Sequence, residues 1–151
     1  MEAKEVYYSD LFKKIANGQK IMLNKGMSYF GITYVQSLVI LHLSHMREVH
    51  GDAYEVSQKD IENYLLLAGS TVTHILARME ENGCIVRAKS NRDNRANKLV
   101  LTEKGASYVP LFFEVLDDVE QTMTAGMSGE ERAALKALME KVLDNMQNQR
   151  K

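Results

Sequence analysis

A cluster of basic side chains in one short polar segment is the part of this sequence most suited to binding chemistry. Between positions 87 and 98 a single acidic residue, Asp93, stands among five cationic ones: Arg87, Lys89, Arg92, Arg95 and Lys98. Long basic side chains on a hairpin tip can enter the narrow minor groove of DNA, where the negative potential attracts arginine. A charged, solvated turn has the same composition, so the neighbouring segments decide between the two interpretations.

The segment directly before this cluster predicts an amphipathic helix that begins near Ser70. Its apolar residues recur as one helical stripe: Val72, Ile75, Leu76 and Met79. With that stripe facing the core, Ser70 and His74 point directly away from it, while Thr71 and Arg78 flank the same outward face. Hydroxyl and imidazole groups near a helix N-terminus can meet base edges and phosphates in a major groove. An ordinary solvated helix face is the alternative interpretation.

The order of elements around the cluster predicts a helix-turn-helix followed by a β-hairpin. Ser57-x-x-Asp60 matches a capping box, which starts a short helix. Gly83 suits the left-handed position that closes the amphipathic helix. Short apolar runs at 84–86 and 99–101 predict paired strands on either side of the polar segment. This order is the one that a winged helix-turn-helix needs to put one helix in a DNA major groove with a hairpin arm beside it.

The N-terminal part predicts two further helices. Apolar residues at helical spacing indicate a first helix from about residue 7 to 23, which the segment 26–32 interrupts. Thr33-x-x-Gln36 is another capping box, and it starts a buried helix that continues to about residue 50.

The C-terminal part predicts two long amphipathic helices. Thr102 caps the first, and Pro110 inside it lacks an N–H, which predicts a kink at that position. Ser128-x-x-Glu131 is a third capping box and starts the last helix. The terminal helices carry more apolar surface than the central segment requires, and such helices usually bury that surface against another chain.

These motifs resemble the MarR family of bacterial regulators. Three segments follow that family's helix-turn-helix, recognition helix and wing: QKDIENYL, STVTHILARMEENGCIVR and DNRANKLVLTEKG. Asp93 and Arg95 stand at the spacing of the family's wing motif. Leu101, Thr102 and Gly105 stand at the spacing of the helix start that follows it. The specific motifs cover the middle of the chain, and the helix order resembles the family over most of its length.

The resemblance implies an obligate homodimer that binds a palindromic site on double-stranded DNA with two recognition helices and two wings. By motif position, Arg95 is similar to the wing arginine that reaches the minor groove, and Asp93 to its orienting partner. The matching recognition helix carries Ser70, Thr71, Thr73, His74 and Arg78. Arg92 and Lys98 complete the candidate DNA-binding residues on the wing.

Two positions depart from the family pattern. Ala68 precedes the recognition helix where the family commonly has a polar cap residue, and alanine is a poor N-cap at a typical cost of ~1 kcal/mol relative to serine. His74 stands where the family often carries arginine or another polar residue. The start of the recognition helix and the base preference therefore do not follow from the resemblance.

The predicted fold is mainly α with a small β-hairpin wing, a winged helix-turn-helix with N- and C-terminal dimerisation helices. We expect one unit over residues 1–151, in which about 33–102 forms the DNA-binding domain. About 1–32 and 103–151 supply the dimerisation helices. The net charge is only −1, but residues 71–105 carry seven basic and four acidic side chains. The positive field thus falls on the segment expected to meet DNA.

Other features of the sequence predict the cellular location of the protein and whether it is an enzyme. No apolar run approaches the ~18 residues of a membrane span, and the N-terminus lacks the apolar core of a secretory signal. Cys84 is the only cysteine, and its apolar context predicts a buried structural thiol. We expect a cytoplasmic protein without membrane contact. It has no Gly-rich phosphate loop, nucleophile elbow or HExxH motif, so we expect neither an enzyme nor a cofactor.

Three histidines raise the question of a metal site. His42 and His45 are one helical turn apart, and His50 follows on the same segment. A metal-responsive regulator is therefore an alternative. The later helix offers Tyr108 and Phe112 rather than further histidines, which favours ordinary polar histidines and no metal.

Methionine and tyrosine side chains suit a crevice between the dimerisation helices and the winged domain, where members of the family bind small aromatic or lipophilic effectors. The first candidates for such a pocket are Tyr7, Tyr8, Met22, Met27, Tyr29 and Phe30. A methionine-rich core and dimer interface is the favoured alternative.

We therefore expect a dimeric, sequence-specific DNA-binding transcriptional regulator, a repressor that a small-molecule effector releases. The alternative is a winged-helix module for protein contacts with no sequence-specific DNA role. Such a module has less reason to cluster basic residues beside a hydroxyl-rich helix.

Overall fold

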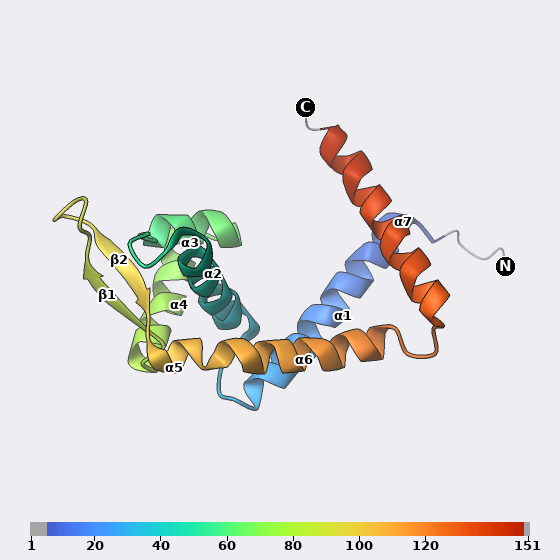
Figure 1. Cartoon of the computed structure of the whole chain (residues 1–151), viewed down its shortest axis with the longest axis horizontal. Coiled ribbons are helices and arrows are strands. Elements are labelled where there is room, and N and C mark those ends of the chain that lie inside the picture. The colour runs from blue at the N-terminus through green and yellow to red at the C-terminus, as the bar shows by residue number, and fades with distance from the viewer. Residues whose placement is uncertain (1–5, 150–151) are drawn as a thin grey trace. The chain divides into compact units, whose positions relative to one another are not determined.

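The computed structural model describes residues 6–149, which form helices and one two-stranded hairpin (Figure 1). In chain order the elements are α1 (Tyr8–Ser28), α2 (Tyr34–His50), α3 (Gln58–Leu65), α4 (Gly69–Glu81), β1 (Ile85–Lys89), β2 (Asn97–Leu101), α5 (Glu103–Ala106), α6 (Tyr108–Met123) and α7 (Gly129–Asn148). The helix pair α3–α4 followed by the antiparallel strands β1 and β2 confirms the predicted winged helix-turn-helix. Within residues 6–149, every helix is too short or too polar to span a membrane.

The chain divides into two compact units, the first ending at Leu116 and the second beginning at Asp117. The first unit contains α1 to α5, both strands and the first part of α6. The second contains the rest of α6 and all of α7. The assignment of 33–102 as a DNA-binding domain and of the terminal helices to dimerisation stays a prediction.

Capping boxes begin three helices where the sequence predicts them. At the start of α2, α3 and α7, a serine or threonine hydroxyl accepts a hydrogen bond from the backbone N–H three residues later. The side chain at that later position accepts from the N–H of the cap residue, so two otherwise free donors are satisfied. The pairs are Thr33–Gln36, Ser57–Asp60 and Ser128–Glu131.

The first helix is longer than the sequence predicts. α1 continues to Ser28 instead of ending near Leu23. The chain then turns at Gly31, whose φ of 75° is a left-handed conformation that glycine adopts without steric cost. The predicted interruption is therefore confined to the last part of the segment 26–32.

The long helix predicted after Thr102 is divided into α5 and α6 at Ser107. Pro110 has no N–H to donate to the carbonyl of Ala106, and its ring would collide with that carbonyl in a continuous helix. The predicted distortion is present, but it lies three residues before the proline rather than at it.

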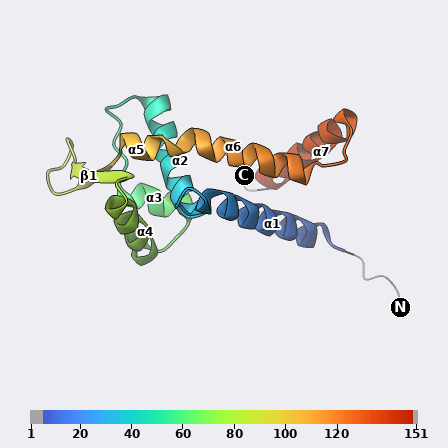
Figure 2. The ribbon, with the colours of Figure 1, turned by 90° about the horizontal axis from the view of Figure 1, so that it is seen from below.

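An apolar core holds the helix pair and the hairpin together. Ile61 of α3, Leu76 of α4 and Ile85 of β1 are almost completely buried. α4 contacts α2, α3 and β1, and Figure 2 shows α4 beside α3 and the hairpin. Because Val72 and Met79 are buried on the same side as Leu76, the opposite face of α4 is directed outward.

The hairpin and α5 approach each other most closely at Gly105. A Cβ at this position would overlap the carbonyl oxygen of Cys84 and would lie 2.7 Å from Cδ1 of Leu101. The Thr102 hydroxyl accepts from the backbone N–H of Gly105 at 3.0 Å, which holds the start of α5 against the end of the hairpin. Only glycine fits this contact.

We predict that Gly105→Ala lowers the free energy of unfolding by about 1–3 kcal/mol, because the backbone carbonyl of Cys84 and the side chain of Leu101 must move to admit the methyl group. Urea denaturation measures the change. Gly129→Ala is the control, since a Cβ there meets no atom within 4 Å. Equal stability of the two variants would contradict the close approach.

Candidate nucleic-acid interface

The outward face of α4 carries the side chains that the sequence selects for DNA contact. Ser70, Thr71, Thr73, His74 and Arg78 are all exposed. The helix begins at Gly69, and Ala68 supplies no side-chain hydrogen bond to its start. The carboxylate of Glu62 lies beside this start, because a Cβ at Gly69 would come 2.9 Å from its Oε1. A negative charge near a helix N-terminus is favourable and offsets part of the missing cap.

Thr73 differs from the other residues on this face. Its hydroxyl donates to the carbonyl of Gly69 at 2.8 Å and accepts from Nε2 of Gln58 at 2.9 Å. The hydroxyl therefore already serves to hold α4 against α3. Ser70, Thr71, His74 and Arg78 remain as the groups best able to contact a ligand.

Gln58, the first residue of α3, joins three elements through its side-chain amide. Its Nε2 also lies 3.3 Å from Oε1 of Glu62 and 3.4 Å from the carbonyl of Gly69. Its Oε1 accepts from the guanidinium of Arg87 at 3.3 and 3.4 Å. Arg87 in turn pairs with Glu80 of α4 at 3.2 Å. Sequence reasoning missed Gln58, because no motif marks the residue that follows the Ser57 cap.

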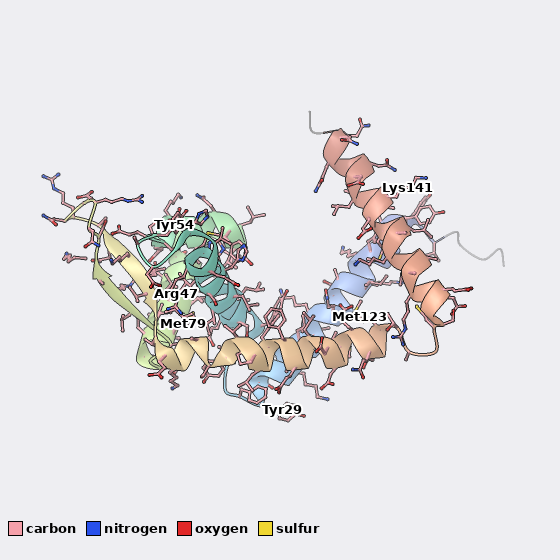
Figure 3. The ribbon with its side chains drawn as sticks, in the orientation of Figure 1. Tyr29, Arg47, Tyr54, Met79, Met123 and Lys141 are labelled. Atoms are coloured by element: carbon pink, nitrogen blue, oxygen red, sulfur yellow. The ribbon has the colours of Figure 1, made fainter. Side chains whose placement is uncertain are left out.

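The tip of the hairpin, residues 90–96, carries two exposed arginines, and exposed Lys89 directly precedes it. The strands pair in register from Ile85 opposite Leu101 to Lys89 opposite Asn97. Arg92 and Arg95 are exposed, and Figure 3 shows nitrogen-ended side chains projecting from this tip. Among residues 6–149, no ion pair engages either arginine.

Asp93 and Lys98 of the wing already have bonding partners within the domain. The Asp93 carboxylate accepts from the backbone N–H of Arg95 at 2.9 Å, so it fixes the main chain of the tip. Lys98 lies 3.7 Å from the carboxylate of Glu55 and its side chain is 21% exposed. The predicted DNA contacts of these two residues stay predictions, and Lys98 would have to leave or share its ion pair.

Comparison with known protein sequences identifies the family of this chain. The sequence model described as the MarR family matches residues 30–96. The organic hydroperoxide resistance transcriptional regulator of Bacillus subtilis (strain 168) is 32% identical over 117 residues, which make up 76% of this chain and 72% of that protein. The chain belongs to the MarR family.

Two further relatives show the extent of the similarity. The regulator PecS of Dickeya dadantii (strain 3937) is 30% identical over 66% of this chain and 60% of that protein. The chain thus spans about 60% of the length of the first curated relatives that it matches. The matched chain in the crystal structure of an S. aureus MepR–DNA complex is 28% identical in sequence to this chain. The structural match covers 95% of this chain and 99% of that chain, with a TM-score of 0.71.

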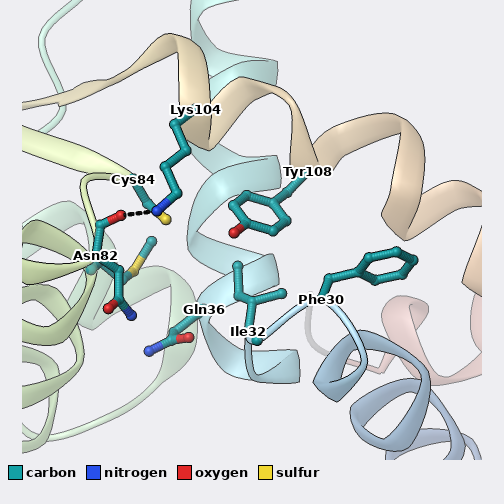
Figure 4. A pocket seen from close by; sticks show the side chains of 9 residues that line it. Phe30, Ile32, Gln36, Asn82, Cys84, Lys104 and Tyr108 are labelled. Atoms are coloured by element: carbon teal, nitrogen blue, oxygen red, sulfur yellow. Dashed lines mark hydrogen bonds between the residues drawn. The ribbon is translucent and has the colours of Figure 1, made fainter.

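A cavity of about 210 Å³ lies beside the end of α4, between it and the turn after α1 (Figure 4). Ile32, Gln36 and Tyr108 are among its walls. At its edge Lys104 donates to the carbonyl of Asn82 at 2.6 Å.

The six residues predicted to line an effector pocket do not come together around this cavity. Phe30 lines it, whereas Met27 is fully buried in the core. Met22 is half-buried, and the tyrosines at 7, 8 and 29 are largely exposed. A pocket at these positions in this MarR-family protein stays a prediction.

Cys84 is buried, as the sequence predicts. Burial raises the pKa of its thiol, and the nearby Lys104 only partly opposes that change. A thiol with a raised pKa forms little of the nucleophilic thiolate. The structure therefore supports a packing role for this cysteine.

Two of the three histidines stack on tyrosines. His42 lies 4.1 Å from Tyr64 and His50 lies 4.5 Å from Tyr54, measured between ring centroids. Within the described part of the chain, no three histidine, cysteine, aspartate or glutamate side chains are grouped to hold a metal ion.

We predict that Gln58→Ala lowers the free energy of unfolding by about 1–3 kcal/mol, because Thr73 and Arg87 lose a partly buried partner. Urea denaturation measures the loss. Lys59→Ala, which removes the ion pair between the exposed Lys59 ammonium and Glu62 at 2.9 Å, is the matched control and should change stability by less than about 1 kcal/mol. A smaller effect at Gln58 than at Lys59 would count against its role.

Stability should also depend on pH through His42. Burial lowers the pKa of this imidazole, Asp60 partly opposes the change, and His45 adds to it. A lowered pKa in the folded state means that stability is complete above the ordinary histidine range and declines as pH falls through the folded-state pKa. Between about pH 7.5 and about pH 5, His42→Phe should lose less stability than the parent protein in urea titrations. An equal loss in both proteins would exclude His42 as the cause.

Proposed function

We propose that this chain is a homodimeric transcriptional regulator that binds a palindromic site on double-stranded DNA. In each subunit α4 enters the major groove and the wing reaches the adjacent minor groove. The observation that carries the proposal is the joint exposure of hydroxyl, imidazole and guanidinium groups on α4 and on the tip of the hairpin packed against it. The similarity to a MepR–DNA complex supports the same mode of binding.

Exposed apolar surface supports the dimer. In the single chain, α1 exposes Tyr8, Leu11, Phe12, Ile15 and Ile21, and α7 exposes Leu135, Leu138, Met139, Val142, Leu143 and Met146. α7 has no buried residue at all. Most of the stability of an amphipathic helix in a folded protein comes from packing of its apolar face. A second copy of this chain is the partner that we propose.

Regulation is part of the same proposal. Recognition helices that read half-sites one turn apart must keep a separation of about 34 Å. A small aromatic or lipophilic effector that prefers a dimer with a different separation would release the DNA, and the protein would then act as a cytoplasmic repressor. A dimer with one geometry in the presence and absence of effector would contradict this mechanism.

We predict that Arg95→Ala weakens binding to a preferred duplex by about tenfold or more, since a base-reading arginine is typically worth about 1–3 kcal/mol. Fluorescence anisotropy measures the affinity, with a duplex that the protein selects from a random-sequence pool and a scrambled duplex as comparison. Affinity should fall steeply with salt, and the variant should show a shallower slope because it releases fewer counterions.

Arg47→Ala is the control, because Arg47 lies in the last turn of α2 and pairs with Asp52 at 3.6 Å. It should bind both duplexes as the parent protein does. If the parent protein binds the selected and scrambled duplexes equally, the proposal of sequence-specific regulation fails and a protein-binding winged module becomes the better description.

A further inference from the structure

A carboxylate outside the hairpin holds the start of the wing tip. Glu55 lies in the loop between α2 and α3, and its side chain is 10% exposed. It accepts from the hydroxyl of Ser90 and, at 2.7 Å, from the backbone N–H of Asn91. These two donors, followed by the Lys98 and Arg92 charges, hold the pKa of Glu55 below its ordinary value. Glu55 is therefore an ionised acceptor at neutral pH.

Ser90 connects Glu55 to the following residues of the wing tip through hydrogen bonds of its hydroxyl. Its side chain is only 8% exposed, and its hydroxyl hydrogen is donated to Glu55. The same oxygen accepts from the backbone N–H of Arg92 at 3.0 Å and of Asp93 at 3.2 Å. A serine hydroxyl has one hydrogen and two lone pairs, so all three of its bonding positions are used.

The hydrogen bonds continue to the second arginine. Asp93 accepts through its carboxylate from the N–H of Arg95 at 2.9 Å and through its carbonyl from the N–H of Ala96 at 3.0 Å. Ser90 closes the turn by donating its own N–H to the carbonyl of Ala96 at 3.1 Å. The backbone N–H groups of Arg92 and Arg95 are thus both tied, directly or through Asp93, to Ser90 and Glu55.

Glu55 is itself fixed on the winged domain. The next residue, Val56, accepts from the N–H of Leu99 at 2.8 Å and forms a bridge to β2. Lys98 in the same strand completes the ion pair with Glu55. The wing tip therefore takes its orientation from the loop that precedes α3 as well as from its own strands.

We propose that Glu55 and Ser90 are positioning residues for DNA binding, which set the backbone of the wing tip so that Arg92 and Arg95 are presented together. This inference rests on the proposed function, in which the wing contacts DNA. The two residues touch no base or phosphate themselves. They reduce the number of conformations that the tip must give up when its arginines bind.

The sign of the effect distinguishes positioning from simple charge. Removal of a carboxylate near a DNA-binding surface should strengthen attraction to the phosphates if only the local field matters. Loss of the hydrogen bonds to the tip should weaken binding instead. Ser90→Ala separates the two causes further, because it breaks the same hydrogen bonds without any change in net charge.

The test is anisotropy with the selected and scrambled duplexes, using the full chain. Glu55→Ala and Ser90→Ala should each weaken binding to the selected duplex by about tenfold, the scale of one lost arginine contact. Asp52→Ala is the matched control, since this carboxylate lies in the same loop, is 94% exposed and pairs only with Arg47 among the described residues. It should bind as tightly as the parent protein or slightly more tightly.

A second comparison shows whether the effect passes through the arginines. In a chain that already carries Arg92→Ala and Arg95→Ala, adding Ser90→Ala should cause almost no further loss of affinity for the selected duplex, because the tip then has neither arginine side chain to position. Amide hydrogen exchange should be faster at Arg92, Asp93 and Arg95 in Ser90→Ala, with α4 unchanged, which excludes general unfolding.

Three outcomes would overturn the inference. Glu55→Ala could bind as tightly as the parent protein, Ser90→Ala could leave affinity unchanged, or the loss could persist in the background without the two arginines. Each of these leaves the proposed function standing, because the parent protein still prefers the selected duplex. If the parent protein itself shows no preference, the proposed function fails first and takes this inference with it.

Discussion

The orientation of α4 depends on the side-chain amide of Gln58. The apolar stripe of α4 packs on the core around Ile61 and Leu76 and decides which face of the helix is buried, but apolar contacts are not directional and oppose small rotations of the helix only weakly. The hydrogen bonds of Gln58 to Thr73 and Arg87 do have direction. A rotation of α4 by one residue would remove Thr73 from Gln58 and would turn Ser70 and His74 away from the outward face. The surface proposed to read DNA therefore depends on a contact that lies behind it.

The basic residues of the wing also divide into ion-paired residues that hold the domain together and exposed residues that are free to bind. Of the five basic residues between positions 87 and 98, Arg87 is paired with Glu80 and Lys98 with Glu55. These ion pairs join the hairpin to α4 and to the loop before α3, so they add rigidity to the domain. Within the described residues, Lys89, Arg92 and Arg95 form no ion pair and are exposed. The number of basic residues therefore overstates the positive charge available to DNA, because Arg87 and Lys98 are held in ion pairs within the domain.

Features that depend on residues close together in the sequence could be predicted. Capping boxes, the outward face of α4 and the strand pair could be predicted because each follows from residues within one turn or one hairpin. The kink predicted at Pro110 was misplaced and the helix is divided at Ser107 instead, since the proline acts on a carbonyl four residues earlier. The contacts of Gln58 with Arg87 and of Glu55 with Ser90 join residues 29 and 35 positions apart. No periodicity encodes such side-chain pairings, because they exist only after the chain has folded.

The terminal helices connect stability to assembly. α7 has twenty residues and none of them is buried in the single chain, while its apolar side chains recur on one face. Most of the stability of an amphipathic helix in a folded protein comes from packing of its apolar face, so α7 is stabilised when another surface covers that face. If a second copy supplies that surface, the free energy of folding contains a term that depends on protein concentration. Folding, dimerisation and the spacing of the two α4 helices would then be properties of one equilibrium, and any ligand that prefers one dimer geometry would act on DNA binding through it.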